Sequence, residues 1–261
     1  MKASPRGLRL VLWVVLASHV LLHAQTAETY KPKVRQSGKD VIWMPTPQAL
    51  VETMLDMANV TPQDLVMDLG SGDGVIVITA AKRGARAIGI EYNPDLVLLS
   101  RNVAAAQGVG ERATFVQADL FTVDLSNATV VTMFLLPSIN LKLRPTLLEL
   151  KPGTRIVSNT FDMGEWTPDE KKVIGPAGCT NWCTAMLWII PAKAQGTWRT
   201  SQGVLRIRQS FQTISGTLGT TPITGRVMSD RITFTAASTQ YSGKVAGKVI
   251  QGSNWSATRV D

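Results

Sequence analysis

Short apolar runs alternate with helical patterns over residues 41–195. A stripe of apolar positions at helical spacing follows Thr46 and Pro47, which suit the N-cap and the first position of a helix. Continuous apolar strands between helices predict a mostly parallel sheet buried on both faces, which is a doubly wound α/β fold. We expect strands at 65–69, 87–91, 114–118, 128–135, 155–161 and 185–191, and further helices at 75–83, 94–107 and 141–150.

The pattern changes at Gly196, where the chain becomes rich in Gly, Thr, Ser and Arg. Apolar and polar positions alternate in short runs, and a motif ending in glycine recurs at regular spacing. The glycines of this motif are Gly216, Gly225, Gly243 and Gly252. Regular turn signals combined with a period of two predict antiparallel strands, so we expect residues 196–261 to form a small all-β barrel or meander.

The first residues have the pattern of a targeting segment. Residues 1–24 begin with three basic side chains and continue with a mostly apolar run that is short for a membrane-spanning helix. We therefore favour a cleaved export signal over an uncleaved anchor, so the chain is expected to be exported or membrane-associated. The polar residues 25–40 are expected to form a linker, followed by the α/β domain at 41–195 and the β domain at 196–261.

The charge of the chain is unevenly distributed. The formal net charge is +8, of which residues 196–261 supply +6, whereas residues 25–195 are close to neutral. Both histidines, His19 and His23, lie in the targeting segment, so a mature chain would contain none. This excludes histidine-based catalytic triads and argues against a zinc centre, and we expect no metal site.

The chain has two cysteines, Cys179 and Cys183. A single extended strand would hold them too far apart for a disulfide, whereas a tight turn between them would allow one. Free thiols are expected if the chain stays in the cytosol, and a hairpin disulfide is expected if it is exported.

A glycine-rich turn, Asp68 to Gly74, follows the first predicted strand. Its glycines let the backbone turn sharply and approach a ligand closely, and the next helix can face an anionic group with its N-terminus. Glu91 ends the next strand, where a carboxylate can accept hydrogen bonds from both hydroxyls of a ribose. Asp119 ends the third strand and can reach an adenine amino group. A dinucleotide fingerprint would need glycine at position 75, which is Val75. The expected cofactor-binding residues are Asp68, Gly70, Ser71, Gly72, Asp73, Gly74, Glu91, Asp119, Leu120 and Phe134.

Residues 41–193 resemble class I S-adenosylmethionine-dependent methyltransferases in these motifs. The likeness extends to bacterial relatives of the mitochondrial lysine methyltransferases that act on the ATP synthase c-subunit and the adenine nucleotide translocase. Beside the glycine-rich turn, it rests on Pro45-Thr46-Pro47, Gly89-Ile90-Glu91, Gln117 to Phe121, Phe134 to Pro137 and Phe161 to Trp166. The resemblance implies a seven-stranded Rossmann-like sheet, S-adenosylmethionine as cofactor, and N-methylation of a protein lysine or another amine.

Class I enzymes hold the methyl acceptor at the carboxyl edge of the sheet. The segment Phe134 to Pro137 ends the fourth strand there, without the Asn or Asp followed by two prolines that is frequent in methylases of nucleic-acid and small-molecule amines. Asp162 follows the fifth strand and is the candidate catalytic residue, either orienting or deprotonating an ammonium group, or serving only as a solvated turn carboxylate. Trp43 and Trp166 are candidates for the walls of a channel around a lysine stem. The expected acceptor-binding residues are Trp43, Leu136, Pro137 and Trp166.

Two functions remain open from the sequence. One is a methyltransferase acting on a protein or another amine, and the other is a non-catalytic envelope protein with a degenerate cofactor pocket. The intact pocket residues favour the enzyme. The basic β domain, in which Arg206 and Arg208 share one strand face, is expected either to dock on an anionic membrane surface or to aid solubility alone. Its sparse aromatic residues argue against a nucleic-acid partner.

Overall fold

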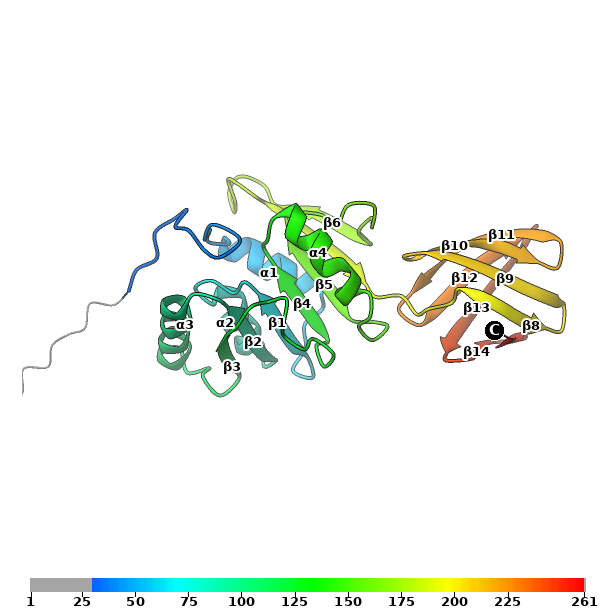
Figure 1. Cartoon of the computed structure of the whole chain (residues 1–261), viewed down its shortest axis with the longest axis horizontal. Coiled ribbons are helices and arrows are strands. Elements are labelled where there is room, and N and C mark those ends of the chain that lie inside the picture. The colour runs from blue at the N-terminus through cyan, green and yellow to red at the C-terminus, as the bar shows by residue number, and fades with distance from the viewer. Residues whose placement is uncertain (1–29, 261) are drawn as a thin grey trace, which may run out of the picture.

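The computed structural model describes residues 30–260, so the expected targeting segment at residues 1–24 lies outside the described part of the chain. Figure 1 shows an α/β domain followed by a separate β-barrel. Between residues 30 and 260, no helix is both long and apolar enough to cross a membrane. The helices are α1 (Gln48–Met57), α2 (Val75–Lys82), α3 (Pro94–Ala106) and α4 (Pro137–Leu147). The strands of the first domain are β1 (Leu65–Leu69), β2 (Arg86–Glu91), β3 (Ala113–Gln117), β4 (Val130–Met133), β5 (Arg155–Asn159), β6 (Glu170–Val173) and β7 (Thr184–Ile189).

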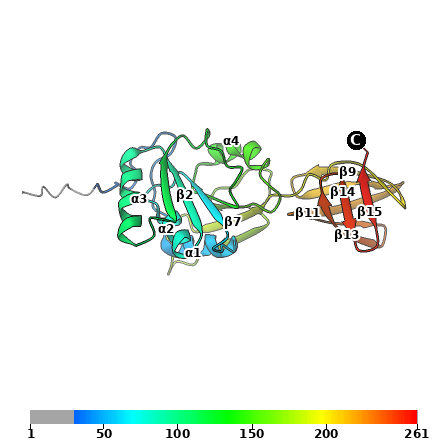
Figure 2. The ribbon, with the colours of Figure 1, turned by 90° about the horizontal axis from the view of Figure 1, so that it is seen from below.

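The α/β domain contains a seven-stranded sheet in the order β3-β2-β1-β4-β5-β7-β6. Strands β1 to β5 pair in parallel, whereas β7 runs antiparallel to both β5 and β6. One apolar cluster packs α1, α2 and α3 on one face of the sheet, and a second packs α4 on the other. Figure 2 shows α1 and α4 on opposite sides of the strands. The predicted doubly wound fold is confirmed.

Two elements differ from the prediction. The sequence pattern does not indicate β6, because its residues Glu170 to Val173 are all exposed at the edge of the sheet and carry no apolar alternation. Helix α4 begins at Pro137 rather than at residue 141, since proline is well suited to the first position of a helix and Leu136 occupies the N-cap.

The last part of the chain forms a closed barrel of eight antiparallel strands. Buried side chains from alternate strand positions, among them Trp198, Leu205 and Ile207, fill its interior. The predicted small all-β barrel is therefore confirmed. The barrel strands are β8 (Gly196–Thr200), β9 (Gly203–Ser210), β10 (Thr213–Leu218), β11 (Thr221–Met228), β12 (Arg231–Ala236), β13 (Thr239–Ala246), β14 (Val249–Gly252) and β15 (Ser256–Arg259).

An aromatic pair joins the barrel to the α/β domain. The ring of Phe211, at the turn between β9 and β10, stacks on Trp166 with 5.7 Å between ring centroids. The side-chain amide of Gln212 donates a hydrogen bond of 2.7 Å to the carbonyl of Thr167. Arg226 forms an ion pair with Asp169, whose side chain is nearly buried. These contacts hold the barrel against the loop that precedes β6.

Candidate active site

The glycine-rich turn connects β1 to α2 at the carboxyl edge of the sheet. Gly70 and Gly72 have left-handed φ angles of 74° and 55°, which side chains other than glycine rarely adopt. A Cβ on Gly72 would lie 2.7 Å from Nε1 of Trp43, so the indole covers this glycine closely. Gly74 serves packing, because a Cβ there would lie 2.7 Å from the ring of Phe115. The turn therefore requires its glycines for backbone shape and for close neighbours within the protein.

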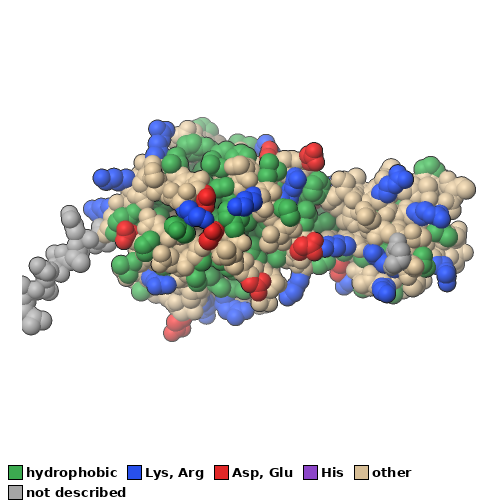
Figure 3. All heavy atoms as spheres, viewed as in Figure 1, with side chains coloured by type: hydrophobic (Ala, Val, Ile, Leu, Met, Phe, Trp, Pro, Cys, Tyr) green, Lys and Arg blue, Asp and Glu red, His purple; other side chains and the backbone are tan. Residues whose placement is uncertain are grey.

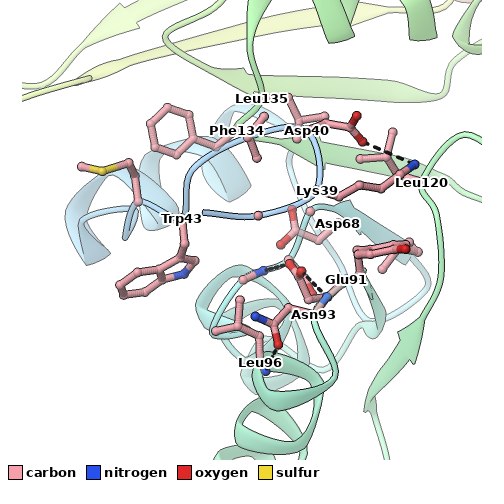
Figure 4. A pocket seen from close by; sticks show the side chains of 18 of the residues that line it. Lys39, Asp40, Trp43, Asp68, Glu91, Asn93, Leu96, Leu120, Phe134 and Leu135 are labelled. Carbon is pink, nitrogen blue, oxygen red and sulfur yellow. Dashed lines mark hydrogen bonds and ion pairs between the residues drawn. The ribbon is translucent and has the colours of Figure 1, made fainter. Parts of the chain in front are cut away.

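Glu91 ends β2 beside this turn. One carboxylate oxygen accepts a hydrogen bond of 2.9 Å from the backbone N–H of Gly72, and the other accepts one of 2.9 Å from that of Asn93. Figure 4 shows the carboxylate between the turn and the start of α3. The side chain of Asn93 in turn caps α3 by accepting from the N–H of Asp95 and of Leu96. A carboxylate has about four lone-pair sites, so Glu91 keeps acceptor capacity for a ligand.

These elements enclose a pocket with about 930 Å³ of empty space, part of it open to solvent. Nine of the ten expected cofactor residues line it, and Gly74 lies outside the lining. The nine are Asp68, Gly70, Ser71, Gly72, Asp73, Glu91, Asp119, Leu120 and Phe134.

Asp68 is the most strongly perturbed group in the pocket. Burial raises the pKa of its carboxyl to about 7, because the charged form loses its hydration, and the neighbouring charges of Asp73 and Glu91 act in the same direction. The hydroxyl of Thr132 donates a hydrogen bond of 2.7 Å to Asp68 and opposes this effect. Burial also raises the pKa of Asp73. The pocket is therefore suited to a ligand that carries positive charge.

The segment from Gln36 to Trp43 forms one wall of the pocket, which corrects the expectation of a linker as far as residue 40. Lys39 bonds to the carboxylate of Asp119 at 2.6 Å and lies over the ring of Tyr92. The other oxygen of Asp119 accepts from the N–H of Phe121. The carboxylate expected to reach an adenine amino group thus has partners within the protein. Its interaction with Lys39 lowers the pKa of Asp119.

The expected acceptor residues separate into two groups. Trp43 lines the pocket together with Phe134, whereas Leu136 and Pro137 lie outside its lining, at the start of α4. Asp162 is exposed outside the pocket, and its carboxylate accepts a hydrogen bond of 3.0 Å from the N–H of Gly164, which is the geometry of a turn.

Trp166 is fully buried, against Phe211 and Trp188. The expectation that it walls an acceptor channel is therefore wrong, because its ring is used at the junction with the barrel.

A disulfide joins Cys179 and Cys183 across the loop between β6 and β7. It closes a short loop that carries Trp182, whose backbone has a left-handed φ of 54°. The ring of Trp182 lies 6.2 Å from that of Phe134, measured between centroids. Sequence reasoning missed Lys39, which lines the pocket, and Trp182, whose ring lies next to Phe134, because both belong to loops without hydrophobic periodicity.

Known proteins resemble this chain over its α/β domain. The family model of the ANTKMT methyltransferase domain matches residues 68–170. A protein-lysine N-methyltransferase of Saccharolobus islandicus is 47% identical over 133 residues, which are 50% of this chain and 83% of the relative. A lysine N-methyltransferase of Homo sapiens that is named for the ATP synthase c-subunit is 35% identical over 167 residues, which are 58% of this chain and 70% of the relative. A crystal structure described as an RNA methyltransferase from Salinibacter ruber in complex with S-adenosyl-L-homocysteine is 49% identical, with a TM-score of 0.53, and covers 57% of this chain and 95% of that one.

Fold, pocket and likeness together define a class I S-adenosylmethionine-dependent methyltransferase. The chain belongs to the family of the protein-lysine N-methyltransferases that it matches, and its residues 68–170 match the ANTKMT methyltransferase domain. The predicted family and cofactor are thereby confirmed. The pocket fits this cofactor, since it combines the spare acceptor capacity of Glu91 and the buried carboxyl of Asp68 with the hydroxyl of Ser71, which has no hydrogen-bond partner among the described residues.

Cofactor affinity should depend on pH through Asp68. The pKa of about 7 means that the empty pocket holds a proton on Asp68 below neutrality, and a cationic ligand beside the carboxylate lowers that pKa. Binding must then release the proton, so affinity rises with pH up to about 7 and levels off above it. We expect roughly a tenfold gain per pH unit at most between pH 5 and 7, measured by calorimetric titration.

The Asp68→Asn variant keeps the shape and removes this titration, so its affinity should be flatter over the same interval. Asp73 and Glu91 are unchanged in the variant, so the pH dependence that remains measures the contribution of the rest of the pocket. An equal slope in the variant and the unchanged protein would assign the titrating group to another carboxyl.

Proposed function

We propose that this protein transfers methyl groups to the side-chain amine of lysine residues in proteins. The observation that carries the proposal is the likeness of its catalytic domain to relatives named for that acceptor, including one of which it covers 83% at 47% identity. The pocket supports it, because Phe134 and Trp43 offer apolar surface where a lysine stem would approach.

S-adenosylmethionine supplies an electrophilic methyl group attached to a sulfonium. Glu91 is placed to hold the ribose hydroxyls, and the carboxylate of Asp68 to offset positive charge in the bound ligand. Residues 30–260 contain no histidine, so the acceptor ammonium must lose its proton to solvent or to a carboxylate before transfer. Much of the rate must then come from the positioning of the neutral amine.

The test is methyl transfer from labelled S-adenosylmethionine to purified ATP synthase c-subunit in detergent and to lysine-containing peptides. We expect methyl-lysine in the digested products by mass spectrometry, and none when the lysines are acetylated beforehand. A chain that binds the cofactor but labels neither kind of acceptor would contradict the proposal.

RNA is a second candidate acceptor, because the Salinibacter ruber relative is described as an RNA methyltransferase. Total RNA belongs in the same assay as a competing acceptor. Label that enters RNA and leaves protein lysines unlabelled would make RNA, and not protein lysine, the acceptor. The absence of a polar residue followed by two prolines after β4 favours lysine.

The barrel is proposed to dock the enzyme on an anionic membrane surface. Along β9, Leu205 and Ile207 are buried, whereas the alternate residues Arg206 and Arg208 are exposed. The two guanidinium groups therefore share the outer face of the barrel. Arg199 of β8 lies on the same face through its pairing with Val204. Figure 3 shows basic side chains spread over the visible face of the barrel. The alternative is that this charge serves solubility alone.

Removal of these charges should weaken vesicle binding. The chain lacking residues 1–24 keeps both folded domains, and it should sediment with phosphatidylglycerol-rich vesicles at low salt and be released at high salt. Because each basic residue contributes about 1 kcal/mol near such a surface, Arg206→Ser with Arg208→Ser should weaken binding roughly tenfold to thirtyfold.

The matched control is Lys171→Ser with Lys172→Ser, the same charge change on exposed β6 of the other domain. Equal binding of the Arg206/Arg208 variant and the unchanged chain would leave solubility as the role of the basic face.

We also propose that the protein is exported or membrane-associated through residues 1–24, with cleavage of an export signal favoured over anchoring. The apolar run after basic residues and the Cys179–Cys183 disulfide support this location, because disulfides persist in oxidising compartments. The mass of the chain purified from its own cells tests it. A chain that retains residues 1–24 and carries two free thiols in cells would contradict export.

A further inference from the structure

Asn159, the last residue of β5, is the most unusual polar side chain near the site. It is 0% exposed, and both polar atoms of its amide lack a hydrogen-bond partner among the described residues. A buried amide without partners costs stability, because the hydrogen bonds that its polar atoms make with water in the unfolded chain are not replaced. Native structures rarely contain such groups without a reason, and one common reason is a ligand that supplies the missing bonds.

The register of the sheet places Asn159 beside the cofactor pocket. Met133 of β4 pairs with Ser158 of β5, so Phe134 and Asn159 follow as the next neighbours along the two strands. Every second side chain of a strand points to the same face of the sheet, so Val130 shares a face with Phe134 and Val157 shares a face with Asn159. Both valines belong to the apolar cluster on the face covered by α1. Phe134 and Asn159 therefore project from the same face.

Two further aromatic rings lie next to Phe134. Phe134, which lines the cofactor pocket, stacks against Phe161 with 6.1 Å between centroids and lies 6.2 Å from Trp182. Trp182 is 37% exposed, so one part of its ring faces the outside and another faces Phe134. The disulfide between Cys179 and Cys183 closes the loop that presents it. Phe134 thus lies between the cofactor pocket and two further aromatic rings, and Asn159 is its neighbour on the adjacent strand.

We propose that the acceptor amine binds between Phe134, Trp182 and Asn159, where the side-chain oxygen of Asn159 accepts a hydrogen bond from the lysine amine and the two rings contact its stem. The inference rests on the proposed function and names the residues that would carry it. A neutral primary amine has two N–H groups and one lone pair. An amide oxygen that accepts one N–H orients the nitrogen and leaves the lone pair free for attack.

A neutral amide suits this task better than a carboxylate would. A carboxylate stabilises the protonated ammonium, whose lone pair is occupied, and raises the pKa of the amine. An amide oxygen favours the charged form less. Asn159 is therefore a residue that binds and orients the nucleophile without keeping it protonated.

The experiment uses n-butylamine, which reproduces the lysine stem and amine, with methylation measured by mass spectrometry on the chain that lacks residues 1–24. Asn159→Leu removes the amide at similar volume and breaks no hydrogen bond of the described protein. We expect an unfolding temperature that is equal or higher, cofactor affinity within twofold, and a kcat/KM for n-butylamine at least tenfold lower.

The pH dependence of kcat/KM in the Asn159→Asp variant distinguishes contact with the amine from a purely structural role. The added carboxylate should hold the amine protonated, so the rise of kcat/KM with pH should shift upward by at least about one pH unit, since a shift of one unit corresponds to about 1.4 kcal/mol. Trp182→Ala should raise KM for n-butylamine and leave cofactor affinity unchanged.

Each result decides the inference separately from the proposed function. No methylation of n-butylamine by the unchanged chain, or an Asn159→Leu variant with full activity, would overturn the acceptor site even if the ATP synthase protein is methylated. Methylation of n-butylamine that depends on Asn159, together with unlabelled protein lysines, would support the amine site and reject protein lysine as its acceptor. A large loss of cofactor affinity in Asn159→Leu would assign the amide to the cofactor instead.

Discussion

Replacement of Glu91 by alanine should lower the affinity for S-adenosylmethionine at least tenfold. The carboxylate offers acceptor capacity to the ribose hydroxyls, and a hydrogen bond to a charged group contributes about 1.5–3 kcal/mol. It also fixes the glycine-rich turn, because its oxygens accept from the backbone N–H groups of Gly72 and Asn93. The variant therefore loses a ligand contact and the support of the turn together. Calorimetric titration with S-adenosylmethionine and with S-adenosylhomocysteine measures the loss.

Glu111→Ala is the matched control, since Glu111 is an exposed glutamate on the turn before β3 and lies outside the pocket. It should bind the cofactor as the unchanged chain does. Glu91→Gln should fall between the two, because the amide keeps one acceptor oxygen and the shape of the side chain. An affinity within twofold of the unchanged chain in Glu91→Ala would contradict the assignment of Glu91 to the ribose.

The order of the main elements could be predicted from the sequence because each carries a strong periodic signal. The strands β1, β2 and β5 each carry buried apolar residues in their middle, and α1 has an apolar stripe that is buried in the structure. The edge strand β6 could not be predicted, since its exposed residues receive their partners only from β7. Local propensity carries no information about such tertiary pairing.

The cofactor side of the site was more predictable than the acceptor side. Glu91 is the last residue of a recognisable strand, and chain order alone places it beside the glycine-rich turn. Lys39 at the pocket and Trp182 beside Phe134 belong to loops whose paths depend on cross-links within the fold. These are the ion pair of Lys39 with Asp119 and the disulfide that closes the loop of Trp182. Asn159 lies in a predicted strand, but its missing hydrogen bonds become visible only when its neighbours are known.

Trp166→Ala should destabilise the catalytic domain by about 3–5 kcal/mol, the usual cost of removing a fully buried large aromatic side chain. The ring packs against Trp188 inside the domain and against Phe211 of the barrel, so the cavity lies at their junction. No hydrogen bond of the indole is lost, because its N–H has no partner among the described residues. The measurement is the midpoint of urea unfolding for the transition that S-adenosylmethionine shifts, since that transition reports the domain that binds it.

The comparison with Trp166→Phe separates packing at the junction from a role in the acceptor site. Phenylalanine keeps a ring against Phe211 and removes the unpaired N–H, so it should recover more than half of the lost stability. In both variants the folded fraction should bind the cofactor and methylate n-butylamine normally, because Trp166 lies outside the pocket. A stability loss below about 1 kcal/mol in Trp166→Ala, under the usual cost of such a cavity, would contradict this packing role. A Trp166→Ala variant that keeps the full unfolding free energy but no longer methylates n-butylamine would instead show that Trp166 contributes to the acceptor site.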